Sequence, residues 1–395
     1  MRADHLEFDA LFQLNWCFAG DFYAQRRLSS GEHPLQLLNE IRRLVVALVF
    51  GRSPEPDYCR GWTSLHRDTA RVQGLTPWLY KSLANHPDNG MPADIKKDLQ
   101  QDYMSSVLAN MNREAALKQV LETLNASNAR PVLLKGAYLG HVVYEEPALR
   151  PMSDVDILVH EDNFEETRNA LVSLGYEIEV EPQSAEDQAL QLAEPYTLGR
   201  CQVAIDLHRS LGAMDYYRFP LPEIWDQITE RRLYGCKVFF LSPEVNFIHV
   251  ATHALNHGPL LRDWLDLVLI LNRTAFEWDQ FLRLSRSFGV MRPMWWVFGE
   301  LGANWECAAP PYVTDALTAY RPHWLEDRII PNRWGYIWRL YAKMWLLDGW
   351  TSRIRFLGSR LFPSKSYRER VTGTRNWAAY VGSKLGHFLH FWRQS

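Results

Sequence analysis

Apolar residues recur three or four positions apart along the first third of the chain. This spacing places them on one face of a helix and predicts amphipathic helices. The helices predicted in this way are residues 34–50, Trp62–Leu83 and Ala93–Leu124. Two segments rich in proline, glycine or asparagine, Ser53–Asp57 and Asn85–Pro92, are typical of loops between helices. We therefore expect a helical N-terminal region over residues 1–128.

The pattern changes after residue 129 to short apolar runs, several of which alternate between apolar and polar positions. A period of two is typical of strands. The predicted strands are Val132–Leu134, Asp154–Val159, Tyr176–Val180, Tyr196–Arg200 and Gln202–Leu207. Helices are predicted at Ala137–Tyr144 and Asp162–Leu174, and an acidic exposed loop or short helix at residues 181–195. We expect residues 129–241 to form one core of strands and helices.

A second helical region is expected over residues 242–330. Ser242 and Pro243 indicate its start, with serine as the N-terminal cap and proline in the first turn. Three histidines follow at intervals of four and share one helical face: His249, His253 and His257. One hypothesis is a metal site completed by Asp263 or Asp266. We favour the alternative, in which the histidines pack against the core or contact a nucleotide base or an acceptor.

The composition is that of an ordinary globular protein, since 47% of the 395 residues are hydrophobic and 23% are charged. The N-terminus lacks a basic segment followed by an apolar one, and no apolar stretch reaches the roughly 18 residues of a membrane span. We expect a cytoplasmic protein without a transmembrane segment. The five cysteines are scattered and form no Cys-x-x-Cys pair, which argues against a zinc site or a disulfide framework.

The net charge of −3 hides a basic C-terminal segment. Residues 331–395 carry twelve lysines or arginines against Asp348 and Glu369, and they contain six tryptophans. Such a segment can bind nucleic acid, an anionic membrane surface or a polyanionic substrate. We favour a different interpretation, in which tryptophans at near-helical spacing pack the segment onto the acidic body and its arginines face carboxylates. Nucleic acid is an open partner, but not the favoured one.

The main candidate chemistry is a set of three aspartates on two predicted strands. Asp154 and Asp156 are two positions apart, so they point to the same face of their strand. Asp206 lies fifty residues downstream on another alternating segment, where it shares a face with His208. Carboxylate oxygens are the ligands that Mg²⁺ prefers, and a further shared carboxylate suits a two-metal site. We expect the three aspartates to be catalytic and to bind Mg²⁺ or Mn²⁺.

A Lys-Gly turn precedes these aspartates in the chain. Lys135 and Gly136 end the first predicted strand and lead into a helix, where backbone amides and the lysine ammonium are placed to meet an anion. Arg150 adds a second cation four residues before Asp154. Ser153 directly precedes the aspartate pair. We expect Lys135, Gly136, Arg150 and Ser153 to bind the nucleotide.

In this order the motifs resemble those of a known family. The residues that carry the resemblance are Leu134-Lys135-Gly136-Ala137-Tyr138-Leu139, Tyr144, Pro147, Arg150, Asp154-Val155-Asp156-Ile157-Leu158-Val159 and Gly175-Tyr176. It continues at Gln73–Tyr80, Asp206–His208 and His249–Asp266, and covers about residues 60 to 275. The chain resembles the uncharacterised nucleotidyltransferase family of bacterial proteins, within the DNA polymerase β-like nucleotidyltransferase superfamily.

The resemblance implies an α+β fold, in which a polymerase β-like mixed sheet with flanking helices lies between N-terminal and C-terminal helical regions. It implies metal ligation by Asp154, Asp156 and Asp206. It also implies phosphate contact by the Lys-Gly turn and Arg150. One departure stands out, because most polymerase β-like enzymes carry Gly-Ser or Gly-Gly at this turn, whereas this chain has Lys-Gly.

A metal-dependent nucleotidyltransferase is therefore the first hypothesis. It would move a nucleoside monophosphate from an NTP, with ATP as the expected donor, to a hydroxyl or phosphate acceptor on a small molecule, saccharide or peptide, and release pyrophosphate. Candidate contacts to the acceptor or base are His208, His253 and Asp263. Two alternatives stay open: a non-catalytic nucleotide-sensing or partner-binding protein, and a toxin-like transferase acting on tRNA through residues 331–395.

Overall fold

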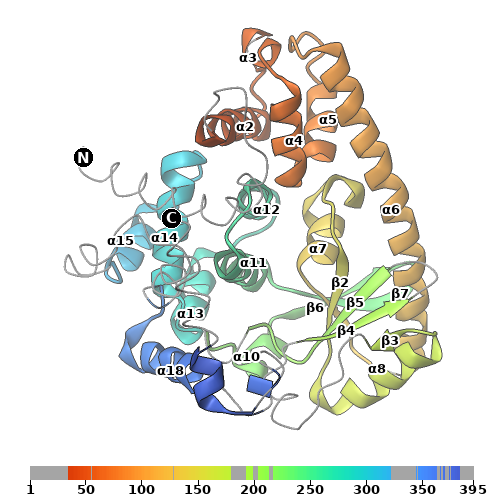
Figure 1. Cartoon of the computed structure of the whole chain (residues 1–395), viewed down its shortest axis with the longest axis vertical. Coiled ribbons are helices and arrows are strands. Elements are labelled where there is room, and N and C mark those ends of the chain that lie inside the picture. Colours follow the sequence, from red (N-terminus) through yellow and green to blue (C-terminus); the bar gives the residue numbers. More distant parts are fainter. Residues whose placement is uncertain are drawn as a thin grey trace.

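The computed structural model describes residues 34–54, 56–127, 129–178, 193–198, 203–212, 217–321 and 346–362, together with residue 344 and several residues between 365 and 382. Within these residues a mixed sheet of seven strands is flanked by helices and joined to a larger helical body (Figure 1). The α+β class expected from the sequence is confirmed. None of the helices in the described part of the chain combines the length and the hydrophobicity that crossing a membrane requires.

The described residues between 34 and 126 are mainly helical, and residues 1–33 of the expected N-terminal region lie outside the described residues. The helices are α2 (Pro34–Val49), α3 (Pro56–Arg60), α4 (Ser64–Val72), α5 (Thr76–Ala84) and α6 (Ala93–Ala126). The single helix predicted over Trp62–Leu83 is wrong, because Gly74 turns the chain with a φ of +69° between α4 and α5. The loop predicted at Ser53–Asp57 is shorter, since α3 begins at Pro56 and proline is favoured in the first helical turn.

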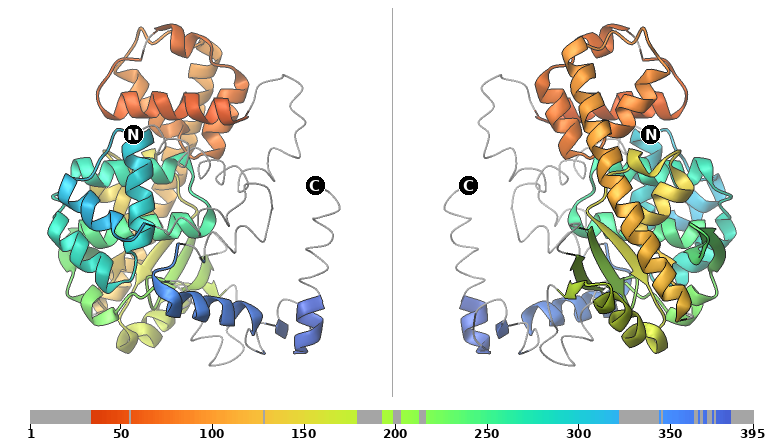
Figure 2. Two further views of the ribbon diagram at one scale, coloured as in Figure 1. Left: turned by 90° about the vertical axis from the view of Figure 1, so that its left-hand side faces the viewer. Right: turned by 90° about the vertical axis from the view of Figure 1, so that its right-hand side faces the viewer.

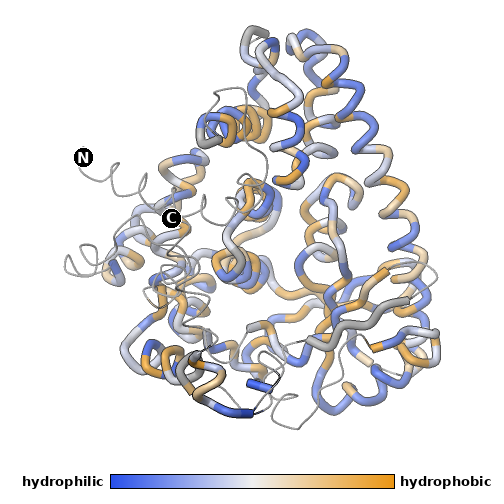
Figure 3. The backbone as a smooth tube through the Cα atoms, viewed as in Figure 1, coloured by the Kyte–Doolittle hydropathy of each residue, from blue (hydrophilic) through white to orange (hydrophobic). Residues whose placement is uncertain are grey.

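Helix α6 connects the helical body with the sheet. It is 34 residues long and runs along one side of the molecule (Figure 1). Near its start Ile95 and Leu99 are buried among other helices, whereas near its end Leu117 and Leu121 are buried with residues of the sheet. In Figure 3 its tube alternates between hydrophilic and hydrophobic colours, as expected for a helix with only one face buried.

The strands lie in the order β3-β4-β5-β2-β1-β7-β6. Their bounds are β1 (Val132–Leu133), β2 (Asp154–Leu158), β3 (Glu177–Ile178), β4 (Ala193–Leu198), β5 (Val203–His208), β6 (Ile228–Leu233) and β7 (Cys236–Leu241). β2 pairs with β5 in parallel and with β1 antiparallel, and β1 pairs with β7 in parallel. Both edges of β2 are therefore hydrogen-bonded, which fixes this strand at the centre of the sheet.

The alternation along β2 separates two layers. Val155 and Ile157 belong to a hydrophobic cluster that includes residues of α6 and of α8 (Glu161–Ser173). Asp154 and Asp156 point to the opposite face. On that side lies α11 (Pro243–His257), which shares a cavity with both aspartates.

The hairpin of β6 and β7 was missed by the sequence patterns. Its turn is Tyr234-Gly235, and both residues have positive φ. Two-residue hairpin loops require such angles, and asparagine or glycine usually signals them. A tyrosine in the first position gives no such signal. The strand predicted at Tyr196–Arg200 is displaced, because β4 begins at Ala193; residues 181–192 lie outside the described residues.

The segment after β1 also differs from its prediction. The sequence indicated a helix over Ala137–Tyr144, whereas α7 (Lys135–Tyr138) begins at the lysine and continues as a π-helical turn over Leu139–Val143. Such turns are rare and frequently occur at functional sites. The lysine of the Lys-Gly turn is therefore itself the first residue of the helix.

The helices after β5 form a second helical part. They are α10 (Leu221–Trp225), α11, α12 (Leu261–Arg273), α13 (Trp278–Ser287), α14 (Met291–Asn304) and α15 (Pro311–Thr318). Helix α10 precedes β6 and the others follow β7, and α12 packs against α2. One hydrophobic cluster unites Ile41 and Leu79 of the N-terminal helices with Trp264, Phe281 and Leu301. Helices that precede the strands in the sequence and helices that follow them thus share one hydrophobic core. The domain boundaries expected at residues 128, 241 and 330 stay a prediction.

The basic C-terminal segment is described only in part. Helix α18 (Gly349–Leu361) lies at the lower edge of the molecule in Figure 2 and buries Phe356. Trp350 is 73% exposed and Trp377 is 44% exposed, so the packing expected for the tryptophans does not hold for these two. The other tryptophans of the segment lie outside the described residues: Trp334, Trp338, Trp345 and Trp392.

Candidate active site

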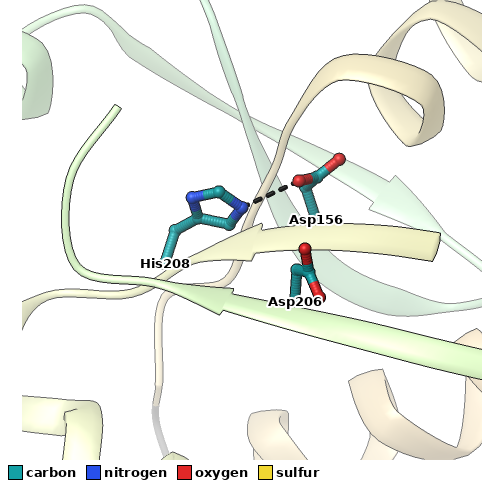
Figure 4. Close-up of side chains that lie close together, drawn as sticks. All are labelled: Asp156, Asp206 and His208. Carbon is teal, nitrogen blue, oxygen red and sulfur yellow. Dashed lines mark hydrogen bonds and ion pairs between the residues drawn. The ribbon is translucent and has the colours of Figure 1, made fainter. Parts of the chain in front are cut away.

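Asp156 and Asp206 are direct neighbours on adjacent strands. β2 and β5 run parallel, with Asp156 paired to Asp206 and Asp154 paired to Ala204. Paired residues of parallel strands point to the same face, and His208 joins them because it lies two positions after Asp206. Figure 4 shows the two aspartates side by side, with the His208 ring directed at Asp156. The structure therefore brings the three predicted aspartates to one face of the sheet.

Asp156 is buried and accepts two hydrogen bonds on one oxygen. The residue is 3% exposed, and its Oδ1 lies 2.5 Å from Lys135 Nζ and 2.7 Å from His208 Nε2. Burial by itself would raise the pKa of Asp156. The hydrogen bond from His208 and the charges of His208 and Lys135 outweigh that effect and hold the pKa well below its usual value. Asp156 is therefore an ionised carboxylate in the folded protein.

The pKa of Asp206 is shifted in the opposite direction. Burial, together with the charges of Asp154 and Asp156, raises this pKa to about 6. Three carboxylates on one face repel each other. A divalent cation bound among them would relieve that repulsion, because the ion is the largest local charge in such a site.

Lys135 has an unusual backbone conformation. Its φ is +37°, in the left-handed region that favours glycine. The chain is held there by the preceding residue, since the Leu134 N–H donates to the carbonyl of Asp156 at 3.0 Å. Backbone and side chain thus both connect the Lys-Gly turn to Asp156.

Gly136 allows Arg150 to lie against the turn. A Cβ at Gly136 would stand 2.8 Å from Arg150 Nη1 and 3.1 Å from Met152 Cβ. Both distances are shorter than ordinary carbon contacts, so a larger residue would displace one of these side chains. The glycine is therefore required by the close approach of these two side chains, and its contact with a ligand stays a prediction.

Arg150 is bound mainly by an aspartate of α12. Its Nε and Nη2 donate to the two oxygens of Asp266 at 2.9–3.1 Å, and the Tyr144 hydroxyl donates to Asp266 at 2.7 Å. Asp266, one of the candidate ligands for the histidine face, is fully buried in this pair. Within the described residues Nη1 of Arg150 makes no hydrogen bond, so one edge of the guanidinium is available to a ligand at the turn.

A cavity of about 510 Å³ adjoins the aspartates. The sheet and the Lys-Gly turn form one wall, and α11 and α12 form the other. The predicted site residues that line it are Lys135, Gly136, Arg150, Ser153, Asp154, Asp156, Asp206, His253 and Asp263. His208 is buried behind Asp156. This volume is in the usual range for small-molecule and cofactor sites.

Of the α11 histidines whose side chains are described, neither His249 nor His253 belongs to a group of three or more possible metal ligands among the described residues. His253 is exposed and lines the cavity, whereas His249 is 2% exposed. Burial, followed by the charge of Lys135, lowers the pKa of His249 well below its usual value, so this imidazole is neutral. The side chain of His257 lies outside the described residues. His249 is thus packed in the interior, and contact of His253 with a base or an acceptor stays a prediction.

The residues present fit a hard divalent cation. Asp156, Asp206 and His208 each offer a ligand atom within 4.8 Å of the others, and Asp154 lies on the same face. Carboxylates suit Mg²⁺ and Mn²⁺ better than imidazole does. Because His208 Nε2 already contacts Asp156 Oδ1, we assign the histidine to orienting that carboxylate.

Two arginines that are not among the predicted site residues hold the loop before Asp154. Arg113 of α6 donates to the carbonyl of Met152 at 2.6 Å, and Arg262 of α12 donates to that of Pro151 at 3.1 Å. Burial lowers the pKa of Arg113, and the charge of Asp154 opposes this shift. Arg113 lies within a long helix without any local motif, so only the tertiary structure reveals its position beside the site.

Residues 60–299 match the model of a family described as uncharacterised nucleotidyltransferase. Two similar solved structures are the antibiotic-resistance factor ANT(2'')-Ia, with 14% identity over 45% of this chain and 91% of that chain, and an antigenic nucleotidyltransferase-like protein from Paracoccidioides brasiliensis, with 15% identity over 52% and 97%. Both have a TM-score of 0.34. No curated protein matches the sequence.

Proposed function

Because this chain belongs to the uncharacterised nucleotidyltransferase family and is an enzyme of that transferase class, we propose that it moves a nucleoside monophosphate from an NTP to a hydroxyl or phosphate acceptor and releases pyrophosphate. One observation carries the proposal. The in-register pairing of Asp156 with Asp206 puts two carboxylates side by side, with Asp154 on the same face, at a cavity of about 510 Å³. Nucleotidyl transfer needs such a group of oxygen ligands beside a substrate-sized space.

Asp154, Asp156 and Asp206 would hold Mg²⁺ or Mn²⁺. When bound, such ions stabilise the charge on the attacking and leaving oxygens and lower the pKa of an acceptor hydroxyl. His208 supports this role by holding Asp156 in one orientation through Oδ1. Its Nδ1 is buried and has no hydrogen-bond partner within the described residues, so Asp156 is the one described group that orients the ring.

The Lys-Gly turn and Arg150 are the proposed binding site for the triphosphate. Lys135 adds positive charge beside Asp156, and Gly136 leaves the room that Arg150 Nη1 occupies. The ion pair with Asp266 fixes the plane of the Arg150 guanidinium. Arg150 therefore loses no further side-chain freedom when Nη1 binds a phosphate. Ser153 lines the same wall, and its hydroxyl donates to Asp154 at 3.1 Å.

The opposite wall is the proposed site for the base or the acceptor. His253 of α11 and Asp263 of α12 line it. Asp263 accepts from the Leu260 N–H at 2.9 Å, and burial raises its pKa. Both side chains are therefore positioned by helices, which hold a binding residue more precisely than a loop does.

The direct test is incubation with each α-labelled NTP in turn, with Mg²⁺ or Mn²⁺ and cell extract. The expected result is transfer of label to an acceptor, detected by mass spectrometry, together with release of pyrophosphate. Saturable ATP binding in a calorimeter without any product would instead support a nucleotide-sensing protein. The accepted nucleotide and the modified molecule from the same experiment identify the donor and the acceptor class.

A further inference from the structure

Lys135 differs from an ordinary phosphate-binding lysine in where its ammonium lies. Nζ is 2.5 Å from Oδ1 of Asp156, and the lysine side chain is only 17% exposed. The same oxygen accepts from His208 Nε2 at 2.7 Å. A carboxylate oxygen has two lone pairs, so these two donors saturate Oδ1 and leave Oδ2 of Asp156 for any other ligand.

The backbone at Lys135 adds a second, independent observation. The described residues other than glycine with positive φ are Lys135, Tyr234 and Glu306. Of these three, Lys135 is the one that lines the cavity. Glycine would adopt a φ of +37° without steric conflict. Strained backbone persists at sites where the side chain serves a purpose, and here the strain places an ammonium on a buried carboxylate.

The charges around the cavity determine how many divalent ions the aspartates can bind. Asp154, Asp156 and Asp206 carry three negative charges when ionised, and the Lys135 ammonium offsets one of them. Arg150 is paired with Asp266 and Arg262 lies 3.7 Å from Asp263, while Arg113 donates to the carbonyl of Met152, so among the described residues Lys135 is the cation in direct contact with one of the three aspartates. Two negative charges remain, which one divalent ion balances.

A set of three carboxylates would otherwise bind two divalent ions. We propose that the Lys135 ammonium is a permanent positive charge of this site and neutralises the carboxylates in place of one of these ions. The enzyme then binds one divalent ion tightly in the absence of nucleotide. The ammonium repels a second ion, because it stands in direct contact with the carboxylate that both ions would share. This inference rests on the proposed function, since it concerns the same three aspartates.

Titration of the protein with Mn²⁺ tests the inference and does not depend on catalytic turnover. Binding is measured by calorimetry and by the paramagnetic resonance signal of free Mn²⁺. The wild-type protein is expected to bind one Mn²⁺ per chain. Lys135→Met removes the charge at similar side-chain length, and Lys135→Gly also relieves the backbone. Both are expected to bind a second Mn²⁺, or to bind the first at least roughly tenfold more tightly. Lys135→Arg keeps a positive charge and is expected to match the wild type.

Two results would overturn the inference, and they are distinguishable. Equal Mn²⁺ stoichiometry and affinity in the wild type, Lys135→Met and Lys135→Gly removes the role of Lys135 but leaves the metal site intact. If the wild type binds no Mn²⁺, or if Asp206→Asn binds Mn²⁺ as the wild type does, there is no metal site at the aspartates. That result removes both the proposed function and the inference. Circular dichroism confirms the fold of each variant, and Lys135→Met carries the test if the glycine variant does not fold.

Discussion

Arg150 and Asp266 form a buried ion pair between residues 116 positions apart, with distances of 2.9–3.1 Å from Nε and Nη2 to the carboxylate. Asp266 is 0% exposed and Arg150 is 8% exposed. The pair joins the loop before β2 to α12, so it connects the aspartate strand with the helical wall of the cavity. A side chain expected to contact phosphate is thereby also a structural link between the two walls.

Asp266→Ala should lower the free energy of unfolding by about 3–5 kcal/mol, because it leaves the Arg150 charge buried without a partner. Urea denaturation measures the change. Asp315→Ala, at an exposed position of α15, is the matched control and should change stability by less than about 0.5 kcal/mol. Equal unfolding curves for the two variants would show that the pair contributes nothing to the fold.

Asp156→Asn should reduce turnover by roughly 10³-fold or more, because the amide cannot supply the negative oxygen that a divalent cation needs. Pyrophosphate release is the measurement. Asp162→Asn, whose carboxylate is 85% exposed on α8, should retain full activity. Unchanged release by the Asp156 variant, with its circular dichroism spectrum intact, would refute the assignment of the site.

His208→Phe should weaken Mn²⁺ binding by roughly 10- to 100-fold, as expected when the partner that orients a metal ligand is lost. The dissociation constant from calorimetry is the readout, since a residue that only fills space would leave it unchanged. His208→Gln restores an N–H donor and should recover part of the affinity. If both variants bind Mn²⁺ like the wild type, the histidine does not orient Asp156.

Gly136→Ala should raise KM for the NTP by roughly tenfold, since the new Cβ would displace Arg150 Nη1 from its position 2.8 Å away. The control is Gly302→Ala, where the nearest atom outside the helix lies 3.9 Å from the added carbon. That variant should keep its KM and gain up to about 1 kcal/mol in stability, because alanine is the better helix former. Steady-state kinetics with varied NTP compares the two, and an unaltered KM at Gly136→Ala would contradict the phosphate-binding role of the turn.

Asp348 should make stability depend on pH in a defined direction. Burial raises its pKa to about 6 from an ordinary 3.8, although the Met291 and Arg292 N–H groups donate to it. The folded state therefore holds the proton more tightly than the unfolded chain. The resulting stabilisation is complete below pH 3.8 and is lost as the pH rises through 6, which amounts to about 3 kcal/mol.

Asp348→Asn keeps a carbonyl acceptor for the same N–H groups but does not titrate. Urea denaturation of both proteins at pH 4 and pH 7 isolates the effect, because all other groups titrate alike in the two. The wild type should lose about 2 kcal/mol more than the variant between these pH values. Parallel pH profiles would show that the carboxyl is not protonated in the folded protein.

Local patterns were sufficient for much of the secondary structure. Apolar spacing located α2, α6 and the strands β1, β2 and β5 to within a few residues. The failures have local reasons of their own: Gly74 breaks a periodic helical segment, and Tyr234-Gly235 makes a hairpin turn without the usual residues. A pattern of hydrophobicity does not report the backbone angle at a single position, so such breaks escape it.

By itself the sequence determined which residues are candidates for the chemistry and which way they point on their own strands. The alternation of Asp154 with Val155 and Asp156 with Ile157 forces both carboxylates to one face, because successive side chains of a strand point to opposite sides. Only the tertiary structure decided how these groups combine. It set Asp206 in register with Asp156, paired Arg150 with Asp266 and placed the Lys135 ammonium on Asp156. These contacts join residues 21 to 116 positions apart, and such distances depend on how the sheet and helices pack, which no local pattern encodes.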